Sequence, residues 1–180
     1  MVMNEAEANI EMLGMSSLAV FRRVGPARLE GWLDNAARHP GAWLRLKLRC
    51  GGAPIMEAVG ASADMPREQR SCRICGQAAI ETAEHFVSEC PYYNEERRQC
   101  LSRVTELIAG HESPRMAYAV RNADLELFLG DGLLQRLPPL IAQQVDATIC
   151  NFLKVAWRKR RAIWMERCIG DSEWRLRDGV

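Results

Sequence analysis

The chain has 180 residues, of which 48% are hydrophobic and 26% are charged, and its formal net charge is +1. This composition is typical of a folded globular protein and argues against a disordered tail. No run of about 18 consecutive apolar residues occurs, which argues against a membrane span. The acidic N-terminus is unlike a signal peptide. We therefore expect an intracellular protein, in the nucleus or the cytoplasm, with reduced cysteines.

The N-terminal part of the chain has helical periodicity. Apolar residues recur at helical spacings from Asn4 to Val24, and the pair Gly25-Pro26 breaks the pattern. Pro26 can open a second helix with one apolar face, which ends at the turn 39–41. We expect His39, beside the proline of this turn, to be a solvated loop residue.

Residues 43–50 are ambiguous. Leucines alternate with Arg45, Lys47 and Arg49, which is a strand pattern, whereas the composition is that of a good helix former. In a strand the three cations share one face, and in a helix Arg45 and Arg49 do. Either geometry could contact the phosphates of a nucleic acid, and a solvated face beside the core is the alternative. We choose the helix because of the family resemblance described below.

A polar connection over 61–70 leads to the strongest motif in the chain. Cys72, Cys75, His85 and Cys90 form the array C-x2-C-x9-H-x4-C. Zinc takes four ligands tetrahedrally, and thiolate sulfur and imidazole nitrogen are its usual donors. Three cysteines and one histidine therefore complete a closed structural site with no position left for water. Zn2+ is the cofactor we expect.

The residues around the ligands favour closure of the array. Gly76 supplies backbone freedom just after the C-x2-C pair, and Thr82 is a candidate N-cap for a helix that has His85 in its first turn. Pro91 discourages continuation of this helix, so a frayed last turn can direct the thiolate of Cys90 toward the metal.

The array uses three of the seven cysteines. The other four show no second ligand signature, and we expect them to be free, part-buried thiols. They are Cys50, Cys100, Cys150 and Cys168.

The second half of the chain predicts several helices. One runs from Asn94 to Ala109, and a second opens at Ser113-Pro114. The longest extends from Pro138 to about Cys168 with an apolar stripe on one face. Tyr92 and Tyr93 could stack on nucleic-acid bases or pack against the metal module.

The C-terminal 30 residues hold 8 Lys and Arg against 4 Asp and Glu, and they are the only strongly basic part. Five cations fall close together there, interleaved with Trp157 and Trp164. Cations around a tryptophan stripe suit a phosphate backbone, and a solvated helix end is the alternative. The five candidate nucleic-acid contacts are Lys154, Arg158, Lys159, Arg160 and Arg161.

The stretch from Trp43 to Arg98 resembles the zinc-binding region near the C-terminus of reverse transcriptases from non-LTR retrotransposons. The shared features are a basic helix with a glycine-rich turn, the C-x2-C pair, a Glu-Thr-x-Glu-His helix start and a final Cys-Pro. The resemblance covers about a third of the chain. It implies zinc ligands at the four positions of the array and RNA or DNA as the partner. The nine-residue gap between Cys75 and His85 departs from the family pattern.

We expect a mainly α protein, in which a small CCHC zinc knuckle (71–95) is inserted between an N-terminal helical segment (1–70) and a C-terminal helical segment with a basic end (96–180). The clustered carboxylates of a polymerase active site are missing, so we expect no enzymatic activity from this chain. The resemblance implies a zinc-binding and nucleic-acid-binding region of a reverse transcriptase without its catalytic core. The alternatives are a zinc-stapled adaptor for a protein partner and, third, a thiol enzyme that uses Cys72 and Cys75.

Overall fold

The computed structural model describes residues 19–24 and 39–168, and in these ranges the chain is mainly helical, as predicted. No β-strand occurs within the described ranges, where Ser71 and Ile80 form an isolated antiparallel bridge. The helices, with their bounds, are α2 (Ala19–Val24), α4 (Pro40–Arg49), α5 (Met56–Ser62), η2 (Arg67–Gln69), η3 (His85–Glu89), η4 (Pro91–Tyr93), α6 (Asn94–Ile108), α7 (Pro114–Arg121), α8 (Leu125–Leu129), η5 (Leu134–Arg136) and α9 (Pro139–Cys168).

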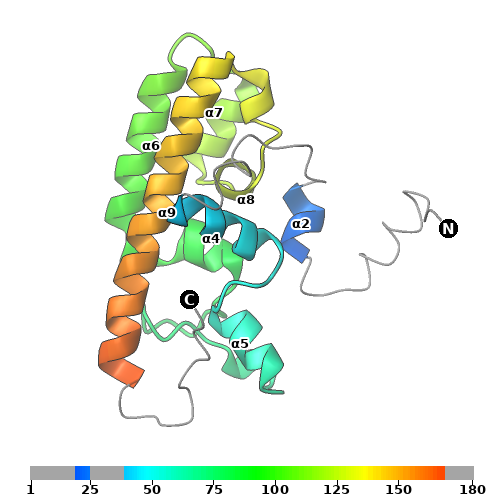
Figure 1. The fold of residues 1–180 in the computed structure, drawn as a ribbon, viewed down its shortest axis with the longest axis vertical. Helices are drawn as coiled ribbons and strands as arrows, with labels where there is room; N and C mark the ends of the chain where they lie inside the picture. Colours follow the sequence, from blue (N-terminus) through cyan, green and yellow to red (C-terminus); the bar gives the residue numbers. More distant parts are fainter. Residues whose placement is uncertain (1–18, 25–38, 169–180) are drawn as a thin grey trace, which may run out of the picture.

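Helices α6 and α9 lie side by side along the long axis of the molecule, and α4 also packs against α9 (Figure 1). The predicted apolar stripe of α9 is confirmed, since Val145, Ile149 and Ala156 are fully buried. Gly41 is the point of closest approach of α4 to α9. A Cβ atom there would lie 1.8 Å from the backbone oxygen of Cys150, so only glycine permits this packing.

Residues 43–49 are helical and Cys50 caps the helix, which confirms the choice of helix over strand. His39 lies just outside the helix, as expected, but it is half-buried instead of solvated. Its Nδ1 accepts a hydrogen bond from the backbone N–H of Gly41 at 3.2 Å, so His39 caps the N-terminus of α4 and Pro40 opens that helix. The predicted helix over 4–24 is described only at Ala19–Val24, and the helix expected from Pro26 lies outside the described residues.

The polar connection expected over 61–70 contains more helix than predicted, because α5 extends to Ser62 and η2 follows. In the second half, Ser113 caps α7 as expected, by accepting a hydrogen bond from the N–H of Met116 at 3.2 Å. The apolar run 125–129 forms the short helix α8.

The segment that carries the metal motif packs into the same hydrophobic core as the helices on both sides of it. Phe86 and Val87 are 0% exposed and belong to one cluster with residues of α4, α6 and α9. The division into parts at 1–70, 71–95 and 96–180, with an inserted knuckle, stays a prediction. Among the helices of the described ranges, none is both long enough and apolar enough to cross a membrane.

Candidate metal centre

The side chains of Cys72, Cys75, His85 and Cys90 converge. Each offers one donor atom, and the four atoms lie within 4.8 Å of one another. In a tetrahedral zinc site, bond lengths of about 2.3 Å to sulfur and about 2.05 Å to nitrogen give separations of about 3.8 Å between sulfurs and about 3.5 Å between sulfur and nitrogen. The distance from Cys75 Sγ to His85 Nε2 is 3.5 Å. The four predicted ligands therefore lie close enough together to bind a single metal ion.

The C-x2-C half of the site is closed by a tight loop. The N–H of Cys72 donates to the carbonyl oxygen of Ala79 at 2.8 Å, next to the bridge between Ser71 and Ile80. Gly76 has a φ of +70°, in the left-handed region that favours glycine. The loop therefore depends on the backbone freedom that the sequence indicated at this position.

The histidine half depends on an unusual helical turn. Thr82 Oγ1 accepts a hydrogen bond from the N–H of His85 at 2.9 Å, which confirms the predicted N-cap. The turn η3 is a π-helix, and the N–H of Cys90 donates to the carbonyl of His85 at 2.6 Å. In an α-helix, residues five apart point about 140° away from each other around the axis. The wider π turn brings Cys90 back to the side of His85, and Pro91 then ends it.

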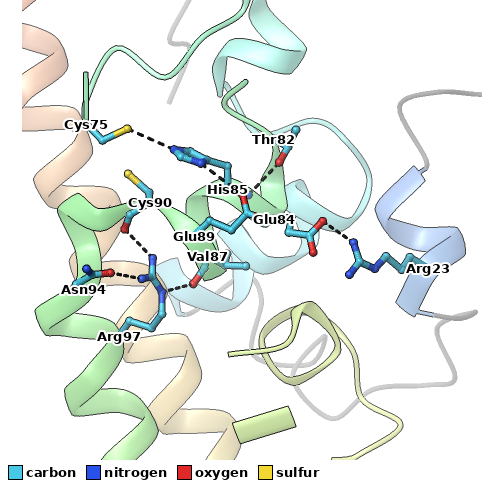
Figure 2. Close-up of polar contacts among 10 residues, drawn as sticks. All are labelled: Arg23, Cys75, Thr82, Glu84, His85, Val87, Glu89, Cys90, Asn94 and Arg97. Atoms are coloured by element: carbon cyan, nitrogen blue, oxygen red, sulfur yellow. Dashed lines mark hydrogen bonds and ion pairs between the residues drawn. The ribbon is translucent and has the colours of Figure 1, made fainter. Parts of the chain in front are cut away.

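Glu89 lies beside the second ring nitrogen of His85 (Figure 2). The Nε2 atom of His85 faces Cys75, whereas the Nδ1 atom is buried and lies 3.6 Å from Glu89 Oε2, slightly beyond hydrogen-bond distance. A histidine that ligates a metal commonly directs its other N–H to a carboxylate, which fixes the tautomer and the ring orientation. Glu89 is placed for this role, and the sequence analysis missed it.

Arg97 of α6 reaches into the metal segment (Figure 2). Its guanidinium donates to the carbonyl oxygens of Val87 at 2.8 Å and Cys90 at 2.9 Å, and to Asn94 Oδ1 at 2.6 Å. Its side chain is 6% exposed, and burial lowers the pKa of the guanidinium. Arg97 was not predicted either, because its only sequence signal was its place among the charged residues that follow Cys90.

The three sulfur atoms are close enough to share protons. A hydrogen bond with Cys90 lowers the pKa of Cys72, and the same bond raises the pKa of Cys90. Burial raises the pKa of Cys75, and a hydrogen bond with Cys72 raises the pKa of His85. Adjacent thiolates repel one another, so a bound cation is what allows all three sulfurs to ionise together.

No family model, no curated protein and no solved structure matches this chain. The resemblance to reverse transcriptases is therefore supported by the motif between Trp43 and Arg98. The candidate metal centre is supported by the arrangement of its four donor atoms.

Arg160 of α9 packs against the metal segment from another side. Its guanidinium forms a bidentate ion pair with Glu81, at 2.8 and 2.9 Å, and the side chains are 2% and 1% exposed. The rings of Trp157 and Trp164 lie 5.0 and 4.7 Å from the same guanidinium. Glu81 also accepts a hydrogen bond from the N–H of Met56 at 2.7 Å, which ties the start of α5 to this contact.

Two predicted contacts on α4 are buried as well. Arg45 is 0% exposed and donates to Asp146 and to the carbonyl oxygen of Gly130, and Arg49 is 1% exposed. The burial of Arg45, Arg49 and Arg160 argues against the prediction that they contact nucleic acid, because these side chains are enclosed by the fold.

The other predicted contacts lie nearer the surface. Lys47 is half-buried over the ring of Trp43, and Lys159 forms an ion pair with Glu96. Lys154, Arg158 and Arg161 follow each other at spacings of four and three along α9, so they share one face of the helix. Arg158 and Arg161 are exposed, Lys154 is half-buried, and within the described part of the chain none of the three has an ion-pair partner.

A groove of about 380 Å³ lies between α6 and α9. Cys100, Phe152 and Thr148 are among its lining residues, and the four candidate metal ligands are not. This groove therefore lies apart from the four candidate metal ligands.

Proposed function

We propose that Cys72, Cys75, His85 and Cys90 hold one structural zinc ion. The observation that carries this proposal is the mutual approach of four donor atoms within 4.8 Å, three of them on side chains that are 3% exposed or less. Thiolate and imidazole donors suit zinc, and the protein supplies all four ligands. The donors lie too close together to surround a cluster of two irons and two sulfides.

The zinc ion acts as a staple in this proposal. It joins the loop after Cys72 to the π turn that begins at His85. Because such a site does not exist in the unfolded chain, the free energy of metal binding contributes directly to folding.

The staple belongs, we propose, to a module that binds RNA or DNA, of the kind found in reverse transcriptases of non-LTR retrotransposons, without the polymerase core. The motif from Trp43 to Arg98 supports this proposal. The face of α9 with Lys154, Arg158 and Arg161 supports it too, because no described carboxylate pairs with these cations, and such cations can neutralise phosphates.

A second candidate is a zinc-stapled adaptor that binds a protein partner and no nucleic acid. The observation that favours it is the burial of Arg45, Arg49 and Arg160, which removes three of the eight predicted cationic contacts. The formal net charge of +1 also favours it.

Zinc stoichiometry of the purified chain, followed by salt-dependent binding to single-stranded RNA, tests both proposals. We expect one zinc per chain and binding that weakens steeply as salt rises. In the double variant R158Q/R161Q, the slope of log affinity against log salt should become shallower by about 2. The matched control is R121Q, since Arg121 is exposed on α7.

The outcomes separate the candidates. A chain without zinc contradicts the metal centre. One zinc per chain without RNA or DNA binding supports the adaptor, and so does binding that R121Q weakens as much as R158Q/R161Q does.

A further inference from the structure

We propose that Arg97 is a positioning residue of the metal centre, which sets the affinity for the ion by fixing the backbone of Cys90 and by offsetting the charge of the bound site. This inference rests on the proposed zinc site and names a residue outside the ligand set.

The first observation is that the side chain of Arg97 extends from α6 to the backbone of the metal segment. Its side chain leaves α6 and places one guanidinium against two carbonyl oxygens of the metal segment, at 2.8 Å for Val87 and 2.9 Å for Cys90 (Figure 2). The third hydrogen bond is donated to Oδ1 of Asn94, the first residue of α6, at 2.6 Å. The planar guanidinium thus clamps the end of the π turn to the start of α6.

The second observation concerns the hydrogen-bond donors available to these two carbonyl oxygens. The last carbonyl groups of a helical turn have no partner within the helix, and Pro91 has no backbone N–H to offer. Arg97 donates to the carbonyls of Val87 and Cys90 with a single side chain. The carbonyl of Cys90 also accepts a hydrogen bond from the N–H of Tyr93 at 3.2 Å, so Arg97 adds a second donor there. Because the carbonyl of Cys90 is held, the direction of its Cα–Cβ bond, and hence the position of its sulfur, is held as well.

The third observation is that the buried guanidinium of Arg97 has no carboxylate paired with it among the described residues. Arg97 is 6% exposed, and no carboxylate lies within ion-pair distance of it among the residues that the structure describes. Glu89 and Glu96 act on this charge only from beyond ion-pair distance, and a buried cation without a paired anion is unfavourable. Three thiolates, a neutral imidazole and Zn2+ leave one negative charge overall. The loaded site and Arg97 therefore compensate each other, whereas Arg160 is already neutralised by Glu81.

The test uses the full chain with two substitutions of Arg97 and one matched control. R97Q removes both the charge and the clamp, R97K keeps the charge without the planar fork, and R98Q changes the exposed neighbour that pairs with Glu95. Competition with a chelator gives the zinc dissociation constant, and the absorption spectrum of the Co2+-loaded chain reports the geometry of the thiolate ligands.

We expect R97Q to raise the zinc dissociation constant by about 10–100-fold, as removal of an outer-shell partner typically does. R97K should fall between R97Q and the wild type, with a cobalt spectrum shifted from that of the wild type. R98Q should match the wild type in both measurements.

Three results overturn the proposal. The first is a zinc affinity and cobalt spectrum of R97Q equal to those of the wild type, even if its melting temperature falls, because Arg97 would then serve the fold alone. If R97Q does not fold, wild-type affinity and spectrum in R97K overturn it instead. A wild-type chain that binds no metal refutes the proposed zinc site itself, and the role of Arg97 with it.

Discussion

The carboxylate of Glu81 and the guanidinium of Arg160 meet in a buried bidentate ion pair, although 79 positions separate them in the chain. Glu81 lies just before the π turn that holds His85, and Arg160 lies on α9 between residues of its basic face. The pair therefore links the metal segment to the helix that carries Lys154, Arg158 and Arg161. Order at the metal centre and the position of the basic face depend on the same contact.

Substitution of Arg160 should destabilise the fold severely. R160M leaves the carboxylate of Glu81 buried without its partner, which typically costs about 3–5 kcal/mol. Urea denaturation of the wild type and the variant gives the free energy of unfolding. The control is R158M, whose exposed side chain should change this free energy by less than about 0.5 kcal/mol.

The double variant E81Q/R160M refines this prediction. It removes both charges, so it should be more stable than the sum of the two single substitutions implies. Two results would show that the ion pair contributes little to stability. One is that the effects of E81Q and R160M on the free energy of unfolding simply add, and the other is that R160M lowers this free energy no more than R158M does.

Removal of the metal should loosen the chain unevenly. A chelator should increase hydrogen exchange first at the backbone amides of residues 72–90, because the ion joins two pieces of this segment. Val145 and Ile149, in the middle of α9, are 0% exposed and should keep their protection longer. Simultaneous loss of protection in both regions would contradict the view of the metal as a local staple.

Replacement of Cys90 should weaken metal binding more than any outer-shell change. C90S substitutes a poor zinc donor at a ligand that is 0% exposed, so the zinc dissociation constant should rise by more than about 100-fold. The matched control is C50S, because Cys50 is exposed and lies outside the ligand cluster. Unchanged zinc content in C90S would remove Cys90 from the ligand set.

Cys100 should make the fold less stable at alkaline pH. Burial raises the pKa of this thiol from 9.0 to about 12. Between these values the unfolded chain has lost the proton that the folded chain keeps, so the free energy of unfolding falls as pH rises, by up to about 1.4 kcal/mol per pH unit. Below pH 9 both states keep the proton, and this contribution is fully present.

The check is the pH dependence of urea denaturation for the wild type and C100A. Above pH 9 the thiol of the unfolded wild-type chain begins to ionise, so the free energy of unfolding should decline less steeply with pH in C100A than in the wild type. Parallel curves would mean that the Cys100 thiol does not resist ionisation in the folded state.

Local signals allowed much of the candidate site to be predicted. The ligand spacing, the N-cap at Thr82 and the stop at Pro91 all act within a few residues of the atoms they position. Capping and proline chemistry therefore indicate the turn that brings His85 and Cys90 together. The π geometry of that turn was not predictable, since the sequence that forms it also suits an ordinary helix.

The outer contacts of the site could not be predicted in the same way. Arg97 looked like one charge among several in a surface helix, and only the packing of α6 against the metal segment makes it a clamp on Cys90. Glu89 was equally indistinct, because its role depends on which ring nitrogen of His85 faces the sulfurs.

The sequence by itself determined the helical character of the chain and the identity of the four candidate ligands, because periodicity, capping and ligand spacing are properties of neighbouring residues. Only the tertiary structure decided which cations are available to a partner. Arg45 pairs with Asp146, which lies 101 positions away in the sequence, and Arg160 pairs with Glu81, which lies 79 positions away. A guanidinium can neutralise a phosphate or a buried carboxylate with the same geometry, and the choice depends on partners that no local pattern reveals.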